Sequence, residues 1–154
     1  MNNPHHLGIK EYLDQSLNKY YIGILKDNGF ELVKSKMSGM AGFYVYKSNW
    51  LNFIIANDRG IIETNISSLY SKEYYDFDII NAYLLRLDGL NSSRNKFGGN
   101  DLTKRLNLEQ ESNLFKSNIE LIKELFNKEN YKKTEFELDR IGNERADLLF
   151  GPIK

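Results

Sequence analysis

The chain has 154 residues, 41% of them hydrophobic and 27% charged, a balance typical of a globular protein rather than a disordered one. Lysine plus arginine and aspartate plus glutamate number 21 each, and the resulting net charge of zero disfavours direct nucleic-acid binding. Cysteine is absent, which excludes thiol chemistry. The two histidines, His5 and His6, are adjacent near the N-terminus, which argues against a histidine base or a cysteine–histidine metal site.

We expect a single domain over residues 1–154, with residues 1–8 as a flexible N-terminal tail. The opening stretch, MNNPHHLGIKEYLDQ, lacks an apolar run of signal-peptide length, and no later segment approaches the length of a membrane span. A cytoplasmic protein with no membrane partner is therefore the expectation.

The first part of the chain predicts a helix followed by strands. Apolar residues recur every three or four positions from Ile9 to Asn28, which predicts a helix. Asn28-Gly29 is typical of a helix C-terminus, and Phe30 should pack back onto that helix. Four short apolar or aromatic runs with tight connections then predict an antiparallel meander. These runs are FELVKSK, GFYVYKS, WLNFIIAN and IIETNIS.

The last two runs flank Asn57-Asp58-Arg59-Gly60, which predicts a tight hairpin. Gly60 should supply the positive φ that such a turn requires, and Asp58 should cap the turn backbone. Arg59 is then an exposed tip residue that could contact a partner. Turn chemistry accounts for the motif without a reactive Asp–Arg pair.

Helices should follow the meander. YYDFDIINAYLLRLDG predicts one, with Asp76 or Asp78 at its N-cap or in its first turn. Residues 88–101 form the longest irregular stretch, and LNLEQESNLFKSNIELIKELFNKEN predicts a long amphipathic helix. The C-terminal segment from Tyr131 is interpreted as helical, although Gly142-Asn143 could split it. The expected fold is α+β: an N-terminal helix, a four-stranded antiparallel β-meander, then two or three C-terminal helices packed on the sheet.

Catalytic motifs are hard to find. Asp76-Phe77-Asp78 lacks the spacing and glycine of an EF-hand loop, and Gly98-Gly99 fits no phosphate-binding loop. Asp58 with Glu63 is the one acidic pair that could serve a carboxylate hydrolase, but a hairpin would leave both in water. We therefore expect a binding protein rather than an enzyme, with no cofactor and no metal.

GFYVYKSNWLNFIIANDRGIIETNIS, preceded by a helix that ends in Gly29-Phe30, resembles the small bacterial immunity proteins encoded beside polymorphic or contact-dependent growth-inhibition toxins. The resemblance covers residues 9–87 and depends mostly on hairpin chemistry. It implies a cytoplasmic antitoxin that binds the C-terminal domain of its cognate toxin, often a nuclease, and occludes the active site.

An acidic segment with interleaved tyrosines is the predicted toxin-binding surface, because acidic groups can imitate a nucleic-acid backbone and speed encounter. For each candidate residue, packing in the core or capping of a helix is the alternative role. The candidate partner-binding residues are Arg59, Tyr70, Glu73, Tyr74, Tyr75, Asp76, Asp78 and Asp88.

Three other functions stay open. A small-ligand module would need an apolar cavity among the tyrosines. A nucleic-acid adaptor would use the basic residues Arg94, Lys96, Lys104 and Arg105. A hydrolase would use Asp58 and Glu63. The sequence leaves the oligomeric state and the identity of the toxin open.

Overall fold

The computed structural model describes residues 8–87 and 102–151 of the chain, and it forms two compact units, Met1–Tyr74 and Tyr75–Lys154. Most of the expected N-terminal tail and the irregular stretch 88–101 lie outside the described residues. The expectation of one domain over the whole chain stays a prediction. In the described part of the chain, no helix combines the length and the apolar character needed to cross a membrane.

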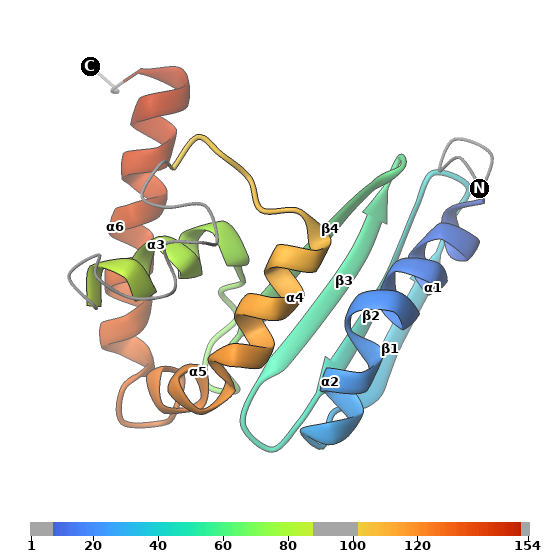
Figure 1. Ribbon diagram of the computed structural model, residues 1–154, viewed down its shortest axis with the longest axis horizontal. Helices are drawn as coiled ribbons and strands as arrows, with labels where there is room; N and C mark the ends of the chain where they lie inside the picture. Colours follow the sequence, from blue (N-terminus) through green and yellow to red (C-terminus); the bar gives the residue numbers. More distant parts are fainter. Residues whose placement is uncertain (1–7, 88–101, 152–154) are drawn as a thin grey trace. The chain divides into compact units, whose positions relative to one another are not determined.

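The first unit contains two short helices and an antiparallel sheet (Figure 1). Its elements are α1 (Ile9–Tyr20), α2 (Ile22–Asp27), β1 (Glu31–Met37), β2 (Ala41–Lys47), β3 (Asn52–Asp58) and β4 (Ile61–Ser67). Each strand pairs with the next in chain order. The α+β class, the N-terminal helix and the predicted four-stranded meander are therefore confirmed.

The helical region predicted from Ile9 to Asn28 is divided at Tyr21. This residue leaves the helical conformation, with φ −125° and ψ −29°, and its side chain is fully buried. Its ring lies 4.9 Å from that of Phe53, and its hydroxyl lies 3.3 Å from Oγ1 of Thr64. The break in the helix thus accompanies the packing of Tyr21 against the sheet, which periodicity alone does not reveal.

The end of α2 follows the sequence signal. Gly29 has a φ of 76°, the left-handed conformation that favours glycine. The Phe30 N–H donates to the Leu25 carbonyl at 2.9 Å, and the Gly29 N–H donates to the Lys26 carbonyl at 3.4 Å. These two bonds form a Schellman motif, and Phe30 is buried as predicted.

The hairpin between β3 and β4 turns through Arg59 and Gly60, whose φ values of 54° and 95° fit a type I′ turn. The prediction for Gly60 is confirmed. The prediction for Asp58 is wrong, because Asn57 caps the turn instead: its Oδ1 accepts the Gly60 N–H at 2.8 Å.

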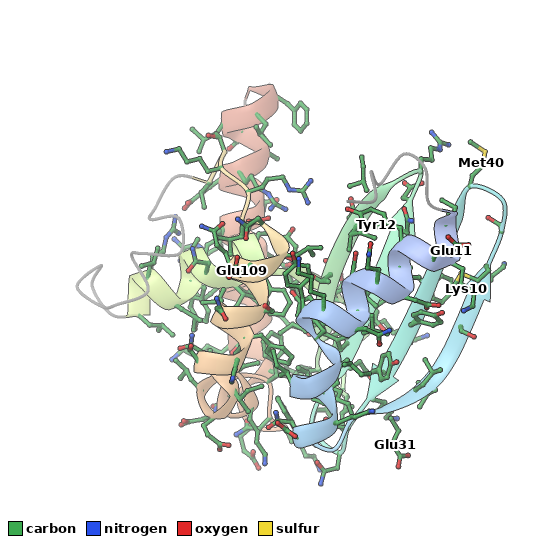
Figure 2. The ribbon with its side chains drawn as sticks, turned by 45° about the vertical axis from the view of Figure 1, so that its right-hand side comes forward. Lys10, Glu11, Tyr12, Glu31, Met40 and Glu109 are labelled. Carbon is green, nitrogen blue, oxygen red and sulfur yellow. The ribbon has the colours of Figure 1, made fainter. Side chains whose placement is uncertain are left out.

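Two further contacts anchor this hairpin. The buried Asn57 donates through Nδ2 to the Ile9 carbonyl at 3.1 Å, so α1 orients the side chain that caps the turn. The Arg59 N–H donates to the Met40 carbonyl at 2.8 Å, which ties the β3–β4 turn to the β1–β2 turn. The side chain of Arg59 is exposed. Figure 2 shows Met40 and Glu31 at opposite ends of the β1–β2 hairpin.

The meander has one face covered by α1 and α2 (Figure 1) and one that carries no helix among the described residues of the first unit. Successive side chains of a strand point to opposite faces. Tyr44, Phe53 and Ile55 are buried on the covered face. The other side, termed the helix-free face, carries Lys34, Lys36, Phe43, Val45, Ile54, Ala56, Glu63 and Asn65.

The second unit starts with a two-residue strand and is otherwise helical. Its elements are β5 (Tyr75–Asp76), α3 (Phe77–Leu87), α4 (Leu108–Ser117), α5 (Ile119–Leu125) and α6 (Tyr131–Phe150). The long helix predicted over residues 106–130 is divided at Asn118, whose φ is −123° and whose Nδ2 donates to the Leu114 carbonyl at 2.9 Å. The C-terminal helix is confirmed, and it continues through Gly142 without a break.

Candidate protein-binding surface

Residues 68–74, SLYSKEY, follow β4 as an irregular segment rich in serine and tyrosine. Ser68 Oγ accepts the Tyr70 N–H at 3.1 Å, and Ser71 Oγ accepts the Glu73 N–H at 3.1 Å. Both bonds are local serine turns, which hold the backbone without a strand or helix. Neither serine is among the predicted partner-binding residues, although the spacing of two residues to each bonded N–H is the usual signal for such turns.

This Ser/Tyr segment exposes large side chains. Tyr70 is 48% exposed, Tyr74 is 42% exposed, and Glu73 lies on the surface between them in sequence. Tyrosine offers a broad apolar area with a polar tip at low cost in side-chain entropy, and loops that recognise other proteins are commonly rich in tyrosine and serine. Three of the predicted partner-binding residues therefore lie together on an exposed, ordered stretch of chain.

Tyr75 packs in the core instead of lying on the surface. Its side chain is 5% exposed, and its hydroxyl donates to Oδ1 of Asp139 on α6 at 2.9 Å. Tyr75 thus packs in the second unit and fastens β5 to α6, so it offers little surface to a partner.

Asp76 has two structural roles in the same unit. Its Oδ1 accepts the Ile79 N–H at 3.0 Å, which confirms the predicted cap at the start of α3. Arg145 of α6 donates to the same carboxylate from both of its terminal guanidinium nitrogens, at 3.1 and 2.8 Å. The negative charge of Asp76 is therefore compensated inside the protein.

Asp78 is buried, with only 7% of its side chain exposed. Its Oδ1 accepts the Leu106 N–H at 2.6 Å, and its Oδ2 lies 3.7 Å from Nε of Arg105. Burial raises the pKa of Asp78, and the repulsion from Asp76 adds to it, while the Leu106 N–H, Arg105 and Arg145 act in the opposite direction. Asp78 thus holds the segment before α4 in place.

The remaining predicted residues lie elsewhere. Arg59 stands at the opposite end of β4 from the Ser/Tyr segment, and a seven-residue strand spans about 24 Å. The structure therefore does not bring Arg59 and Tyr70 together. Asp88 lies outside the described residues, as do Arg94 and Lys96 of the basic set.

The acidic pair considered for a hydrolase lies on the open surface. Asp58 pairs in register with Ile61, and Glu63 pairs with Ala56, so the two acids are diagonal neighbours on exposed strand positions. Neither side chain is enclosed by the fold. In residues 8–87 and 102–151, no group of three or more histidine, cysteine, aspartate or glutamate side chains could hold a metal ion.

A hydrogen-bonded network joins α1 to β2. The Tyr44 hydroxyl and Lys10 Nζ donate to the two oxygens of Asp14, at 2.5 and 2.6 Å; Lys10 is labelled in Figure 2. Burial opposes ionisation of Asp14, but the bonds from Lys10 and Tyr44 outweigh it and lower the pKa of Asp14. Burial and the bond to Asp14 raise the pKa of Tyr44. This arrangement stabilises the charged carboxylate and fastens the helix to the sheet.

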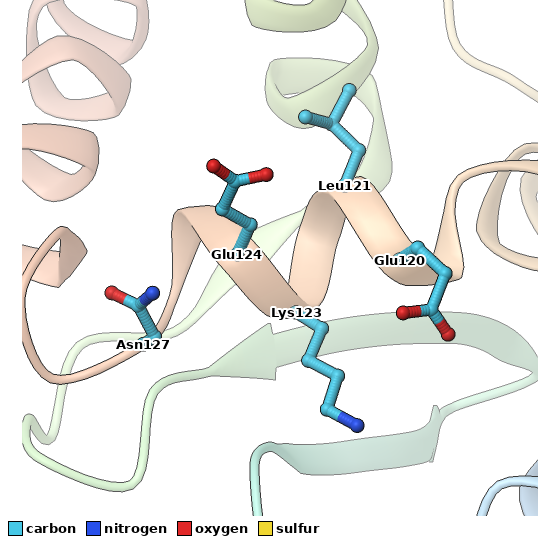
Figure 3. A pocket seen from close by; sticks show the side chains of 5 residues that line it. All are labelled: Glu120, Leu121, Lys123, Glu124 and Asn127. Atoms are coloured by element: carbon cyan, nitrogen blue, oxygen red, sulfur yellow. The ribbon is translucent and has the colours of Figure 1, made fainter.

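A shallow hollow on α5 offers little to a ligand. It is lined by Glu120, Leu121, Lys123, Glu124 and Asn127, which all belong to α5 or the turn after it. Figure 3 shows the side chains of Leu121 and Lys123 pointing in opposite directions, so the lining groups do not converge on a common point.

No protein-family model, curated protein or solved structure matches this chain. The resemblance to immunity proteins therefore stays a hypothesis that depends on the hairpin residues themselves.

Proposed function

We propose that this protein is an immunity protein: a cytoplasmic antitoxin that binds the C-terminal domain of a cognate bacterial toxin and covers its active site. The observation that carries the proposal is the exposure of Tyr70 and Tyr74 on a segment ordered by serine turns. An ordered aromatic surface loses little conformational freedom on binding, which favours tight association.

Two of the predicted acidic residues are engaged by groups of the same chain. Asp76 and Asp78 direct their charge towards Arg145, Arg105 and backbone N–H groups of the same chain. Glu73 is the acid of the predicted set that lies on the surface of the Ser/Tyr segment. The expectation of a nuclease toxin therefore depends on the resemblance, and the binding role depends on the tyrosines.

Co-expression with the toxin domain encoded by the neighbouring reading frame tests the function. The unaltered chain should restore growth and bind that domain directly. Changing Tyr70→Ala together with Tyr74→Ala should weaken binding about 30-fold or more, because exposed tyrosines at the centre of an interface each contribute roughly 1–2 kcal/mol or more.

Phe136→Ala is the matched control, since Phe136 is an aromatic residue of α6 that is also exposed. It should leave protection and affinity unchanged. Failure of the unaltered chain to protect would refute the antitoxin function. Full protection and unchanged affinity with the double tyrosine variant would instead refute the assigned surface.

A further inference from the structure

The helix-free face carries an ordered row of side chains. Strand register places Lys36, Phe43, Ala56 and Glu63 side by side across β1, β2, β3 and β4. The row begins with a positive charge, continues with a large and a small apolar side chain, and ends with a negative charge. Neighbouring strands lie about 4.8 Å apart, so Lys36 and Glu63 are roughly 14 Å apart within one chain and do not pair there.

A second row has the same polarity. It consists of Lys34, Val45, Ile54 and Asn65 on the same four strands. Val45 and Ile54 are only partly buried. Lys34 reaches sideways over the ring of Phe43, with its Nζ 5.8 Å from the ring centroid. The face thus has an apolar centre, lysines along β1, and acidic or amide groups along β4.

We propose that this face binds a second copy of the chain, with the two sheets packed face to face about a two-fold axis parallel to the strands. Such an axis stacks β1 on β4 of the second copy and β2 on its β3. Lys36 then faces Glu63 of the second copy, and Phe43 faces Ala56. Each contact occurs twice, so two ion pairs flank a centre in which large side chains meet small ones.

Charge selects this axis over the other face-to-face arrangement. A two-fold axis across the strands would stack each strand on its own copy and would bring Lys34 of one chain over Lys36 of the other. Like charges at that position would oppose association. The axis parallel to the strands avoids this repulsion and replaces it with attraction.

The area of the face sets the strength of the dimer. Four seven-residue strands cover a footprint of about 450 Å², whereas stable interfaces bury about 800 Å² per partner. We therefore expect a weak dimer whose population rises with concentration in the micromolar range or above. The residues of the proposed dimer contact do not include Tyr70 or Tyr74, so the dimer proposal does not rest on the proposed toxin-binding residues.

Sedimentation equilibrium of the full chain, from micromolar to near-millimolar concentration, tests the proposal. Lys36→Glu alone and Glu63→Lys alone should each weaken the dimer about tenfold, because each places like charges opposite one another. The double variant Lys36→Glu with Glu63→Lys should return the dissociation constant to within about threefold of the unaltered chain.

Lys128→Glu, a charge reversal at an exposed position after α5, is the matched control and should leave the dimer unchanged. A chain that stays monomeric over the whole range would overturn the proposal. A dimer whose dissociation constant is unchanged by either single reversal would also overturn it. The same holds if the double variant dimerises as weakly as the single variants. Circular dichroism of each variant separates loss of the dimer from loss of the fold, and both reversed positions are exposed.

Discussion

The Tyr44 hydroxyl on β2 donates a hydrogen bond of 2.5 Å to Asp14 on α1, across 30 positions of sequence. Lys10 occupies the other oxygen of the same carboxylate at 2.6 Å. One ionised side chain therefore connects the first helix to the covered face of the meander, and this connection should respond to pH.

Replacing Asp14 with Asn should destabilise the protein by about 1 kcal/mol near neutral pH, since a partly exposed charged hydrogen bond is lost. The folded-state pKa of Asp14 lies below its ordinary value of 3.8. The contribution of Asp14 is therefore complete above that value and disappears as the pH falls through the lower folded-state pKa. Thermal unfolding from pH 7 towards strong acid should show the midpoints of the two proteins converging. A constant difference across the series would contradict the role of ionised Asp14.

Asp78 should show the opposite dependence on pH. Burial raises its pKa above the ordinary value of 3.8, so its contribution to stability is complete below that value and is lost as the pH rises through the folded-state pKa. Asp78→Asn keeps an acceptor for the Leu106 N–H and removes the buried charge. Its free energy of unfolding, relative to the unaltered protein, should therefore increase between pH 4 and pH 7.

Asp78→Ala is the companion variant, because it leaves the Leu106 N–H without the carboxylate acceptor. It should cost about 1–3 kcal/mol more than Asp78→Asn at neutral pH, measured by urea unfolding. Equal stability of the two variants would mean that the bond to Leu106 contributes nothing.

Asn57 and Asp58 give a matched test of the hairpin. Asn57→Ala removes the cap on Gly60 and the bond to the Ile9 carbonyl, and it should cost about 2–3 kcal/mol. Asp58→Ala changes an exposed side chain and should stay within about 0.5 kcal/mol of the unaltered protein. Urea unfolding of both variants measures the difference, and a larger loss at Asp58 would restore that residue as the cap.

Two glycines should respond to alanine in opposite ways. Gly142 lies inside α6, and an added Cβ would make an ordinary 3.6 Å contact with Cδ1 of Ile79. Gly142→Ala should therefore stabilise the protein by about 0.5–1 kcal/mol. Gly29→Ala should destabilise it by about 1 kcal/mol, because the φ of 76° strains a residue with a Cβ. Thermal unfolding that moves in the same direction for both variants would contradict this account.

Some of the candidate surface could be predicted from composition. Tyr70, Glu73 and Tyr74 are exposed, as a partner-binding segment requires. Tyr74 and Tyr75 are identical in type and adjacent in sequence, yet only Tyr75 is buried and bonded to Asp139. Nothing local distinguishes the two, because the difference depends on where α6 lies.

The sequence by itself determined the features that arise within a few residues. Gly29 ends the first helical region and Gly60 occupies the hairpin turn because each adopts a positive φ at little steric cost. Short apolar and aromatic runs separated by tight connections predicted the strands. These signals place the meander correctly because neither the backbone preferences of the turns nor the composition of the runs needs a distant partner.

Only the tertiary structure decided which polar groups meet. Asn57 caps the turn and also bonds to Ile9, 48 positions away, while Asp76 pairs with Arg145 across 69 positions. The Asp78 carboxylate accepts the Leu106 N–H across 28 positions of sequence. A carboxylate or an amide can bond to any suitable group that folding brings within about 3 Å, so its partner is set by the packing of helices and strands rather than by local spacing.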